Sequence, residues 1–367
     1  MTMPPPFPDR QFPKTRSTGN KVLIGCGIGC GTIIILIIIA IIIGVWWFFS
    51  TEDQVPTDRI LNTGSSAAFR LEDISRNQEV MQLVTDVLNE AQRMNQNRFS
   101  EQLPEPFKKF QNYFKGQQDP AKLIELFAPK EATVSFSSNE TGNTVFTIAA
   151  NFGTGTRIAK MFLNTAFEND VHLKGKKIST EHGDLYIFDR RDNWNDNKSQ
   201  QGILGFYKGT FIFSNDTKSA TSALDRLADE SNAGELKESL SDPYYRLSRE
   251  GCLAYGVLDS SFFKKAEHGI GPIKGELGSA IKKAEIYLDN LSGENGTLNL
   301  NTDWSSKDIA VKANEEIEKL KPEWIEEAKQ NGFNMEVINS LEDQKLDIRF
   351  RVNNLKDSLI YLIQDMD

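Results

Sequence analysis

The chain has 367 residues, of which 39% are hydrophobic and 25% charged, a composition typical of globular proteins that excludes a wholly disordered chain. The formal net charge is −9, and no basic run follows the first 21 residues, which argues against nucleic-acid binding. The cysteines are Cys26, Cys30 and Cys252, so a disulfide within the region after residue 49 is excluded.

The chain begins with a polar segment rich in proline. Residues 1–21 carry four basic side chains against one acidic side chain. Such a composition cannot bury enough apolar surface to fold. The sequence therefore predicts a disordered cytoplasmic tail over residues 1–21.

An uncharged segment follows the tail. Residues 22–49 contain no charged side chain, and the stretch 33–43 is apolar on every face. A helix of this length is about 42 Å long, which exceeds the roughly 30 Å hydrocarbon core of a bilayer. Trp46 and Trp47 form an aromatic belt at one boundary, and the basic residues before the segment place the N-terminus in the cytoplasm. The sequence predicts a single-pass signal anchor in the cell membrane, with the C-terminal region extracytoplasmic.

Two other interpretations of this segment are a cleaved secretory signal and a lipoprotein signal. A cleaved signal has a shorter apolar region followed by a small-residue site, whereas this run ends in Trp and Phe. The tetrapeptide that ends at Cys26 resembles a lipobox, but the apolar run follows the cysteine here instead of preceding it. Both interpretations are weaker than a membrane anchor.

Four small residues alternate near the start of the apolar segment. Gly25 and Gly29, and likewise Gly27 and Gly31, are four residues apart, which is the spacing that lets two membrane helices approach closely. We expect a homodimer contact on this face. The simpler alternative is that glycine is common in membrane helices.

A linker is expected over residues 50–65, and two strand and helix units follow it at widely separated positions. The first unit has a strand at 66–72 and then apolar residues at helical spacing from Val80 to Ala91. The second has a strand at 252–258, followed by polar capping residues and the pair Phe262–Phe263. The two passages predict one kind of unit used twice.

A second pattern, an alternating hairpin that leads into an amphipathic helix, occurs four times. Strands at 203–207 and 210–213 extend the second hairpin. The expected hairpins are 133–137 with 145–152, 177–180 with 185–189, 284–288 with 297–301, and 335–338 with 346–352. The expected helices cover 156–167, 217–228, 305–317 and 355–363.

These patterns predict an α+β fold with an internal duplication. Hairpins impose antiparallel pairing, and helices that follow hairpins can pack on one face of the sheet or sheets. We expect a first half at 66–250, with a helical insert at 104–128, and a second half at 251–367. The N-terminal transmembrane helix precedes both halves.

The layout of an N-terminal helix before repeated strand-helix and hairpin-helix units resembles a family of uncharacterised bacterial membrane-anchored extracytoplasmic proteins. The resemblance covers residues 66–367 and depends on layout, without a signature motif. Because that family has no established activity, the resemblance implies no functional residue.

The sequence contains no recognisable catalytic or metal-binding constellation. The three histidines, His172, His182 and His268, occur in no known ligand spacing. Glu181, His182 and Asp184 lie together, but in a predicted hairpin turn, where such residues are common for conformational reasons. We therefore predict no catalytic residue, no cofactor and no metal.

Two further residues need an interpretation. Cys252 lies in a predicted strand, on the same face as Ala254 and Leu258, which indicates a core thiol instead of a nucleophile. Trp194 lies in a polar loop next to a charged strand end, which makes it a candidate contact residue.

The function that these features favour is a membrane-tethered, extracytoplasmic binding or scaffold domain without catalytic activity, which contacts a protein or an envelope component. One alternative is a hydrolase whose carboxylates assemble only in the fold, recognisable by a deep pocket with two facing carboxyl groups. Another is a carrier of lipid or another apolar ligand, recognisable by a large apolar cavity. The bilayer and a second copy are the other expected partners, and nucleic acid is not.

Overall fold

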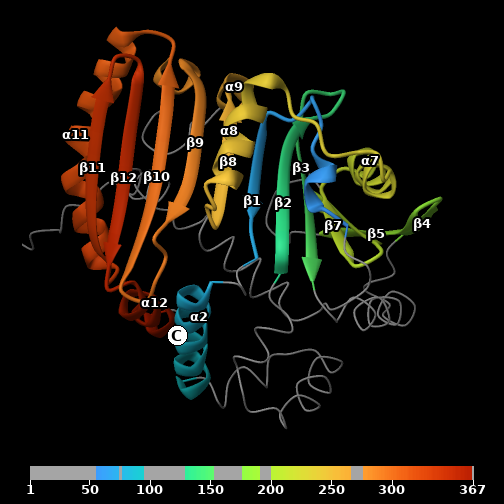
Figure 1. Cartoon of the computed structure of the whole chain (residues 1–367), viewed down its shortest axis with the longest axis horizontal. Helices are drawn as coiled ribbons and strands as arrows, with labels where there is room; N and C mark the ends of the chain where they lie inside the picture. The colour runs from blue at the N-terminus through green and yellow to red at the C-terminus, as the bar shows by residue number, and fades with distance from the viewer. Residues whose placement is uncertain are drawn as a thin grey trace, which may run out of the picture.

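The computed structural model in Figure 1 describes residues 55–73, 77–94, 129–152, 176–190, 200–265 and 276–365. Twelve strands of these residues form one sheet in which all neighbours are antiparallel, in the order β11-β12-β10-β9-β8-β1-β2-β3-β7-β6-β5-β4. The strands are β1 (Ala67–Leu71), β2 (Pro129–Ser138), β3 (Thr144–Phe152), β4 (Lys176–Thr180), β5 (Gly183–Arg190), β6 (Gln200–Tyr207), β7 (Thr210–Ser214), β8 (Ala254–Asp259), β9 (Ile281–Asp289), β10 (Asn295–Trp304), β11 (Asn334–Glu342) and β12 (Lys345–Asn353).

Helices of the described part lie on both faces of this sheet and at one end of it. They are η1 (Thr57–Ile60), α2 (Gln78–Met94), α7 (Thr217–Ala228), α8 (Glu238–Arg249), α9 (Ser260–Lys265), α10 (Glu276–Ser279), α11 (Lys307–Gln330) and α12 (Leu355–Asp365). The helices α2 and α12 contact each other at the lower end of the strands in Figure 1.

One face of the sheet, here named the α8 face, is covered by η1, α7 and α8. The helix α8 buries Leu240, Tyr244 and Leu247 against Tyr255 and Val257 of β8. The helix α7 buries a stripe of small and aliphatic residues against β3, β5, β6 and β7, together with η1. Side chains alternate between the two faces along a strand. The helices α7 and α8 both lie on the face toward which the odd-numbered residues of β8 point.

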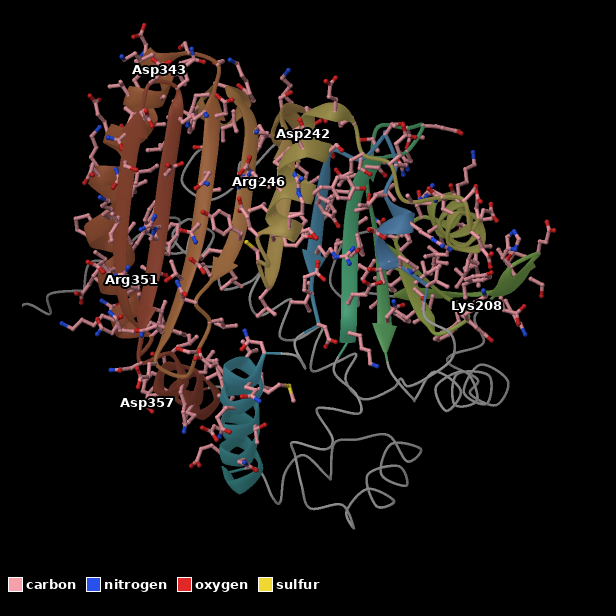
Figure 2. The ribbon with its side chains drawn as sticks, in the orientation of Figure 1. Lys208, Asp242, Arg246, Asp343, Arg351 and Asp357 are labelled. Carbon is pink, nitrogen blue, oxygen red and sulfur yellow. The ribbon has the colours of Figure 1, made fainter. Side chains whose placement is uncertain are left out.

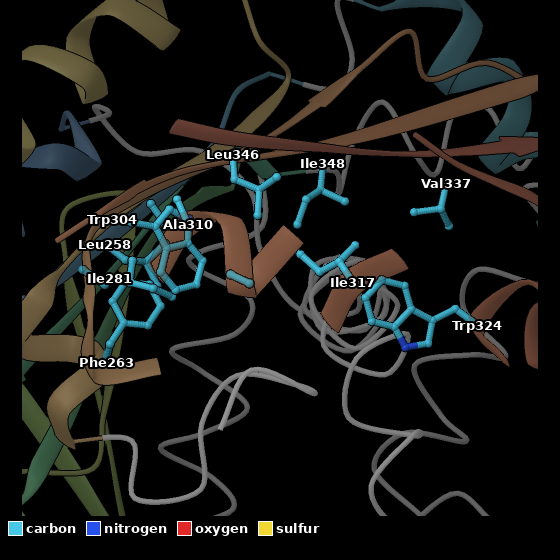
Figure 3. Close-up of a cluster of buried hydrophobic side chains, with 13 residues drawn as sticks. Leu258, Phe263, Ile281, Trp304, Ala310, Ile317, Trp324, Val337, Leu346 and Ile348 are labelled. Atoms are coloured by element: carbon cyan, nitrogen blue, oxygen red, sulfur yellow. The ribbon is translucent and has the colours of Figure 1, made fainter. Parts of the chain in front are cut away.

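The opposite face, named the α11 face, is covered by α9, α10 and α11 in the C-terminal half. Trp304, Ile317 and Trp324 are buried there among Leu346 and Ile348 of β12, as Figure 3 shows. The Trp304 indole Nε1 donates a hydrogen bond of 2.9 Å to the Thr302 hydroxyl, which satisfies the one polar atom of this buried ring.

Local sequence explains where the principal helices begin. The Asp216 carboxylate accepts a hydrogen bond from the Ser219 backbone N–H at the start of α7, and Ser306 does the same for Ile309 at the start of α11. The helix α8 is one that the sequence patterns did not predict. It contains Pro243 within its length, a residue that normally argues against a helix.

The predicted arrangement of layers is wrong. We expected an α+β fold with helices on one face of one or more sheets, but the described residues form mainly one large antiparallel sheet with helices on both faces. The physical reason is that helices that follow different hairpins pack on whichever face their connection reaches, and alternation within a strand does not reveal which face that is. The expected helices at 104–128 and 156–167 lie outside the described residues.

The predicted single-pass membrane architecture and cell-membrane localisation are also contradicted in the described part of the chain. None of the helices in residues 55–365 that the structure describes is long and apolar enough to cross a bilayer. The expected tail at 1–21 and the expected membrane helix at 22–49 lie outside the described residues.

The centre of the sheet depends on a close contact between β1 and β8. Phe69 of β1 is paired with Gly256 of β8, and its ring lies over the glycine. A Cβ atom at position 256 would lie 2.1 Å from the Phe69 Cδ1 atom, a distance that no packed structure tolerates. Phe69 in turn contacts the Phe136 ring edge to face at 5.8 Å. The glycine therefore makes room for the aromatic packing at the sheet centre.

We expect Gly256→Ala to lower the free energy of unfolding by about 1–3 kcal/mol, because the added methyl group overpacks the Phe69 ring. Chemical denaturation measures the change. Gly293→Ala is the matched control, since its Cβ atom would have its nearest neighbour at 4.0 Å. Adding Phe69→Leu to Gly256→Ala should cost less than the two single effects combined, and strict additivity would show that the ring is not the cause.

Candidate binding surface

Most residues singled out from the sequence lie outside the described residues. These are Gly25, Gly27, Gly29, Gly31, Trp46, Trp47 and Trp194, together with His172 and His268. The glycine contact between two copies and the Trp194 contact stay predictions.

The predicted turn cluster is present between β4 and β5. His182 Nε2 lies 3.9 Å from an Asp225 carboxylate oxygen, and Asp184 binds Lys177 at 2.8 Å and Ser179 at 2.8 Å. The hydrogen bond from Lys177 holds the pKa of Asp184 below its usual value. The carboxylate is therefore engaged by its strand neighbours, and the described residues contain no group of three or more side chains with the arrangement of a metal site.

Cys252 lies just before β8 and is half-buried. Its backbone N–H donates to the Leu247 carbonyl at the end of α8, and its side chain packs beside the α8 core. Burial raises the pKa of the Cys252 thiol, so the nucleophilic thiolate is disfavoured at neutral pH.

A cluster that the sequence patterns did not reveal surrounds Arg70 on the α8 face. The guanidinium contacts three carboxylates, Asp58 of η1 at 3.1 Å, Glu72 at 2.7 Å and Glu131 of β2 at 2.9 Å. Glu72 also accepts a hydrogen bond of 3.2 Å from the Tyr255 hydroxyl. Glu72 is near Arg70 in the sequence, whereas Glu131 and Tyr255 are brought to it by the pairing of β1 with β2 and β8, and Asp58 by the packing of η1.

The electrostatics of this cluster follow from burial around one cation. Burial raises the pKa of Asp58 and of Glu131, and the Arg70 charge offsets part of that effect. The nearby Tyr244 hydroxyl is buried and makes no hydrogen bond of standard geometry, and burial raises its pKa as well. Since each carboxylate is bound to Arg70, the cluster joins η1, β1 and β2.

Two hollows in the described part of the chain test the enzyme and carrier alternatives. An apolar cavity beside Phe69, Val134 and Leu288 has a volume of about 50 Å³, well below the roughly 300 Å³ or more of typical ligand pockets. A larger hollow of about 590 Å³ is open to solvent and bordered by Glu72, Asp73 and Glu79. The first hollow is too small for a carrier's apolar ligand, and the second is open to solvent, unlike the deep pocket expected of a hydrolase.

Among the described residues, helix contacts on the α8 face of the last four strands, here named the open face, come from α8 and reach β9. The opposite face of these strands packs against α11 through the core of the α11 face. Across β9, β10, β12 and β11, the side chains of the open face form four registered rows: Lys283, Asp303, Lys345 and Glu342; Glu285, Asn301, Asp347 and Ser340; Tyr287, Asn299, Arg349 and Ile338; Asp289, Thr297, Arg351 and Glu336.

The rows of the open face differ in how well their charges are paired. Lys283 of the first row pairs with Glu285 of the second row at 3.2 Å. In the fourth row, Arg351 pairs with Glu336 at 3.6 Å. Arg246 of α8 also pairs with Glu285, and Figure 2 shows Arg246 beside α8 and Arg351 near the lower end of β12. The third row, here named the central row, contains instead an aromatic residue, an amide, an arginine and an exposed isoleucine.

The central row combines groups that are not satisfied within the described fold. Ile338 is 39% exposed, which leaves an aliphatic surface on this row. The Arg349 Nε atom donates a hydrogen bond of 3.1 Å to Asn299 Oδ1, and Asn299 is only 4% exposed. The Asn299 Nδ2 atom is buried without a hydrogen-bond partner. Sequence alternation in 295–303 and 345–353 indicates a polar strand face but not which amide lacks a partner.

Comparison with known proteins adds no relative. No model of a protein family matches the chain, and no curated protein is significantly similar to it. The resemblance to membrane-anchored bacterial proteins stays a prediction.

We expect Arg70→Met to lower the free energy of unfolding by about 3–5 kcal/mol at neutral pH, because three partly buried carboxylates lose their common cation. The loss should shrink as the pH falls toward about 5. Arg70 lowers the pKa of Asp58 and of Glu131 against the rise that burial causes, so its loss raises both pKa values further. The penalty therefore applies to the ionised carboxylates, is greatest well above the ordinary values of 3.8 and 4.5, and disappears as they bind protons at lower pH.

Denaturant titrations at several pH values measure this change. Arg351→Met is the control, since it removes an exposed ion pair, and it should change stability by less than about 1 kcal/mol. A penalty for Arg70→Met that stays constant with pH would contradict the role of the carboxylates.

Proposed function

We propose that the protein is a non-enzymatic binding domain that contacts a protein partner through the open face of β9–β12. The observation that carries this proposal is the central row, in which the exposed side chains of Arg349 and Ile338 lie beside Asn299, whose Nδ2 donor has no partner, and Tyr287, which packs against the α8 core. Aromatic residues and arginine dominate the energetic centres of protein interfaces. Paired charges around such a centre exclude water and supply specificity.

The dimensions of the open face support this function. The four rows extend about 14 Å across the strands and about 20 Å along them, at about 4.8 Å between strands and about 3.4 Å per residue. With the side chains at its border, this is sufficient for the centre of an interface of roughly 800 Å² per partner. A sheet backed by a packed helix is also pre-organised, which reduces the entropy cost of binding.

The hydrolase and carrier alternatives have less support. The carboxylates around Arg70 are held by ion pairs to one guanidinium. The apolar cavity has a volume of about 50 Å³, which is too small for an acyl chain. A rigid open sheet face accounts for more of the described features than either alternative.

Photo-crosslinking in cells tests the proposal. A photoreactive amino acid at Asp347, which is exposed on the open face, should give one predominant crosslinked protein. The same residue at Lys218 of α7, whose side chain is 78% exposed, is the control and should not give that product. Equal products at both positions, or none at Asp347, would contradict the proposed surface.

A charge exchange then tests specificity without changing net charge. Lys345→Glu combined with Asp347→Lys should weaken binding of the purified crosslinked partner by about tenfold. Each new side chain carries the opposite charge to the one it replaces, so it is no longer complementary to the charge on the partner. Isothermal titration calorimetry measures the affinity, and a melting temperature equal to that of the parent protein shows that the fold is retained.

A further inference from the structure

We propose that the central row recognises a carboxylate group that lies next to an apolar side chain, such as a glutamate beside a leucine in an extended segment of the partner. This inference rests on the proposed function and names the chemistry of the partner. It follows from the unmet groups of Arg349 and Asn299 and from the two residues that flank them.

Arg349 is the first element of the site. Its side chain is exposed, its Nε donates to Asn299 Oδ1, and its charge, with that of Lys345, offsets part of the rise that burial causes in the pKa of Asp347. Arg351, two residues further along the same strand, is instead paired with Glu336. The terminal nitrogens of Arg349 therefore remain available for a carboxylate, which a guanidinium binds through two parallel hydrogen bonds.

Asn299 is the second element, and its orientation is fixed by chemistry. A guanidinium can only donate, so the amide atom that faces Arg349 Nε must be the carbonyl oxygen. The Nδ2 donor then has no partner within the described residues, although Asn299 is almost fully buried. A buried donor without an acceptor costs stability, and such groups are rare in folded proteins. The Arg349 guanidinium lies beside this amide, so a ligand oxygen bound to Arg349 becomes an acceptor for the Nδ2 donor once one of the two side chains moves aside.

The flanking residues define the apolar part of the ligand. Ile338 is the cross-strand neighbour of Arg349, and directly opposed residues have Cβ atoms about 5 Å apart. On the other side, Tyr287 is paired with Asn299 and packs against the α8 core. A carboxylate at Arg349 therefore places its adjacent side chain over Ile338, which covers this exposed aliphatic surface.

The surrounding charges favour a single carboxylate over a phosphate or a polyanion. The four rows contain four basic and six acidic side chains, so the open face as a whole repels a multiply charged anion. The positive potential is local to Arg349 and its neighbour Arg351. A monoanion that reaches into the central row meets these donors, while a nucleic-acid backbone meets the acidic rows.

Peptide binding to the full chain tests this chemistry. The probes are N-acetyl-Leu-Glu-Leu-amide, its Gln counterpart and its phosphoserine counterpart, with dissociation constants from saturation-transfer NMR. The Glu peptide should bind about fivefold or more tightly than the Gln peptide, the difference expected for one charge-assisted pair. Equal affinity for Glu and Gln, or tighter binding of phosphoserine than of Glu, would overturn the inference.

Matched variants locate the site. Arg349→Lys keeps the charge but loses the two-pronged geometry, and should weaken Glu-peptide binding by about fivefold, whereas Arg351→Lys should change it by less than about twofold. Asn299→Leu should also weaken binding while the melting temperature stays the same or rises, because it removes an unsatisfied donor. If Asn299→Leu fails to fold, the Arg349→Lys and Arg351→Lys pair still decides, and equal affinities of these two variants would refute the assignment.

The outcomes separate this inference from the proposed function. A crosslink at Asp347 without any preference for the Glu peptide would retain the binding surface and reject the carboxylate site. Glu-peptide binding that depends on Arg349, without a crosslink at Asp347, would retain the site's chemistry and reject its use in contacting a protein.

Discussion

The antiparallel pairing of β1 with β8 is the constraint on which the rest of the described fold depends. It joins the strands β2–β7 and the strands β9–β12, which otherwise have separate helices, into one sheet. Two features secure it, one on each face. On the α11 face the Phe69 ring lies over Gly256, and on the α8 face Arg70 binds carboxylates from η1 and β2. Alternation along β1 places these adjacent side chains on opposite faces, so a shift of one residue in register would break both.

Much of the local structure could be predicted from the sequence, because hairpins and helix starts are determined within a few residues. The expected strands at 145–152 and 185–189 lie within β3 and β5, and the expected helix at 217–228 coincides with α7. The order of strands could not be predicted in this way. The hairpin β6–β7 lies between β3 and β5 in the sheet although it follows both in the chain, and only non-local packing determines that placement.

The candidate surface was less predictable than the fold. The alternating polar residues of β10 and β12 indicated a solvent-facing side, as in many antiparallel sheets. They did not indicate that Asn299 is buried with an unpaired donor. The orientation of the Asn299 amide depends on Arg349 from another strand, whose Nε donates to the one acceptor oxygen of that amide. Two residues that attracted attention in the sequence have structural surroundings: His182 lies near Asp225 of α7, and burial raises the pKa of the Cys252 thiol.

Two charged regions of the described part differ in how their polar groups are paired. This difference supports the central row as the binding site. Around Arg70, three carboxylates converge on one cation, and most polar atoms find partners within the fold. In the central row, an unsatisfied amide, an arginine without an ion pair and an exposed isoleucine occur together within about three strand spacings. The buried donor is unfavourable for the isolated protein. A bound carboxylate with an apolar neighbour would contact the arginine and the isoleucine as well. Residues that lower the stability of an otherwise well-packed fold are expected where selection has favoured binding over stability.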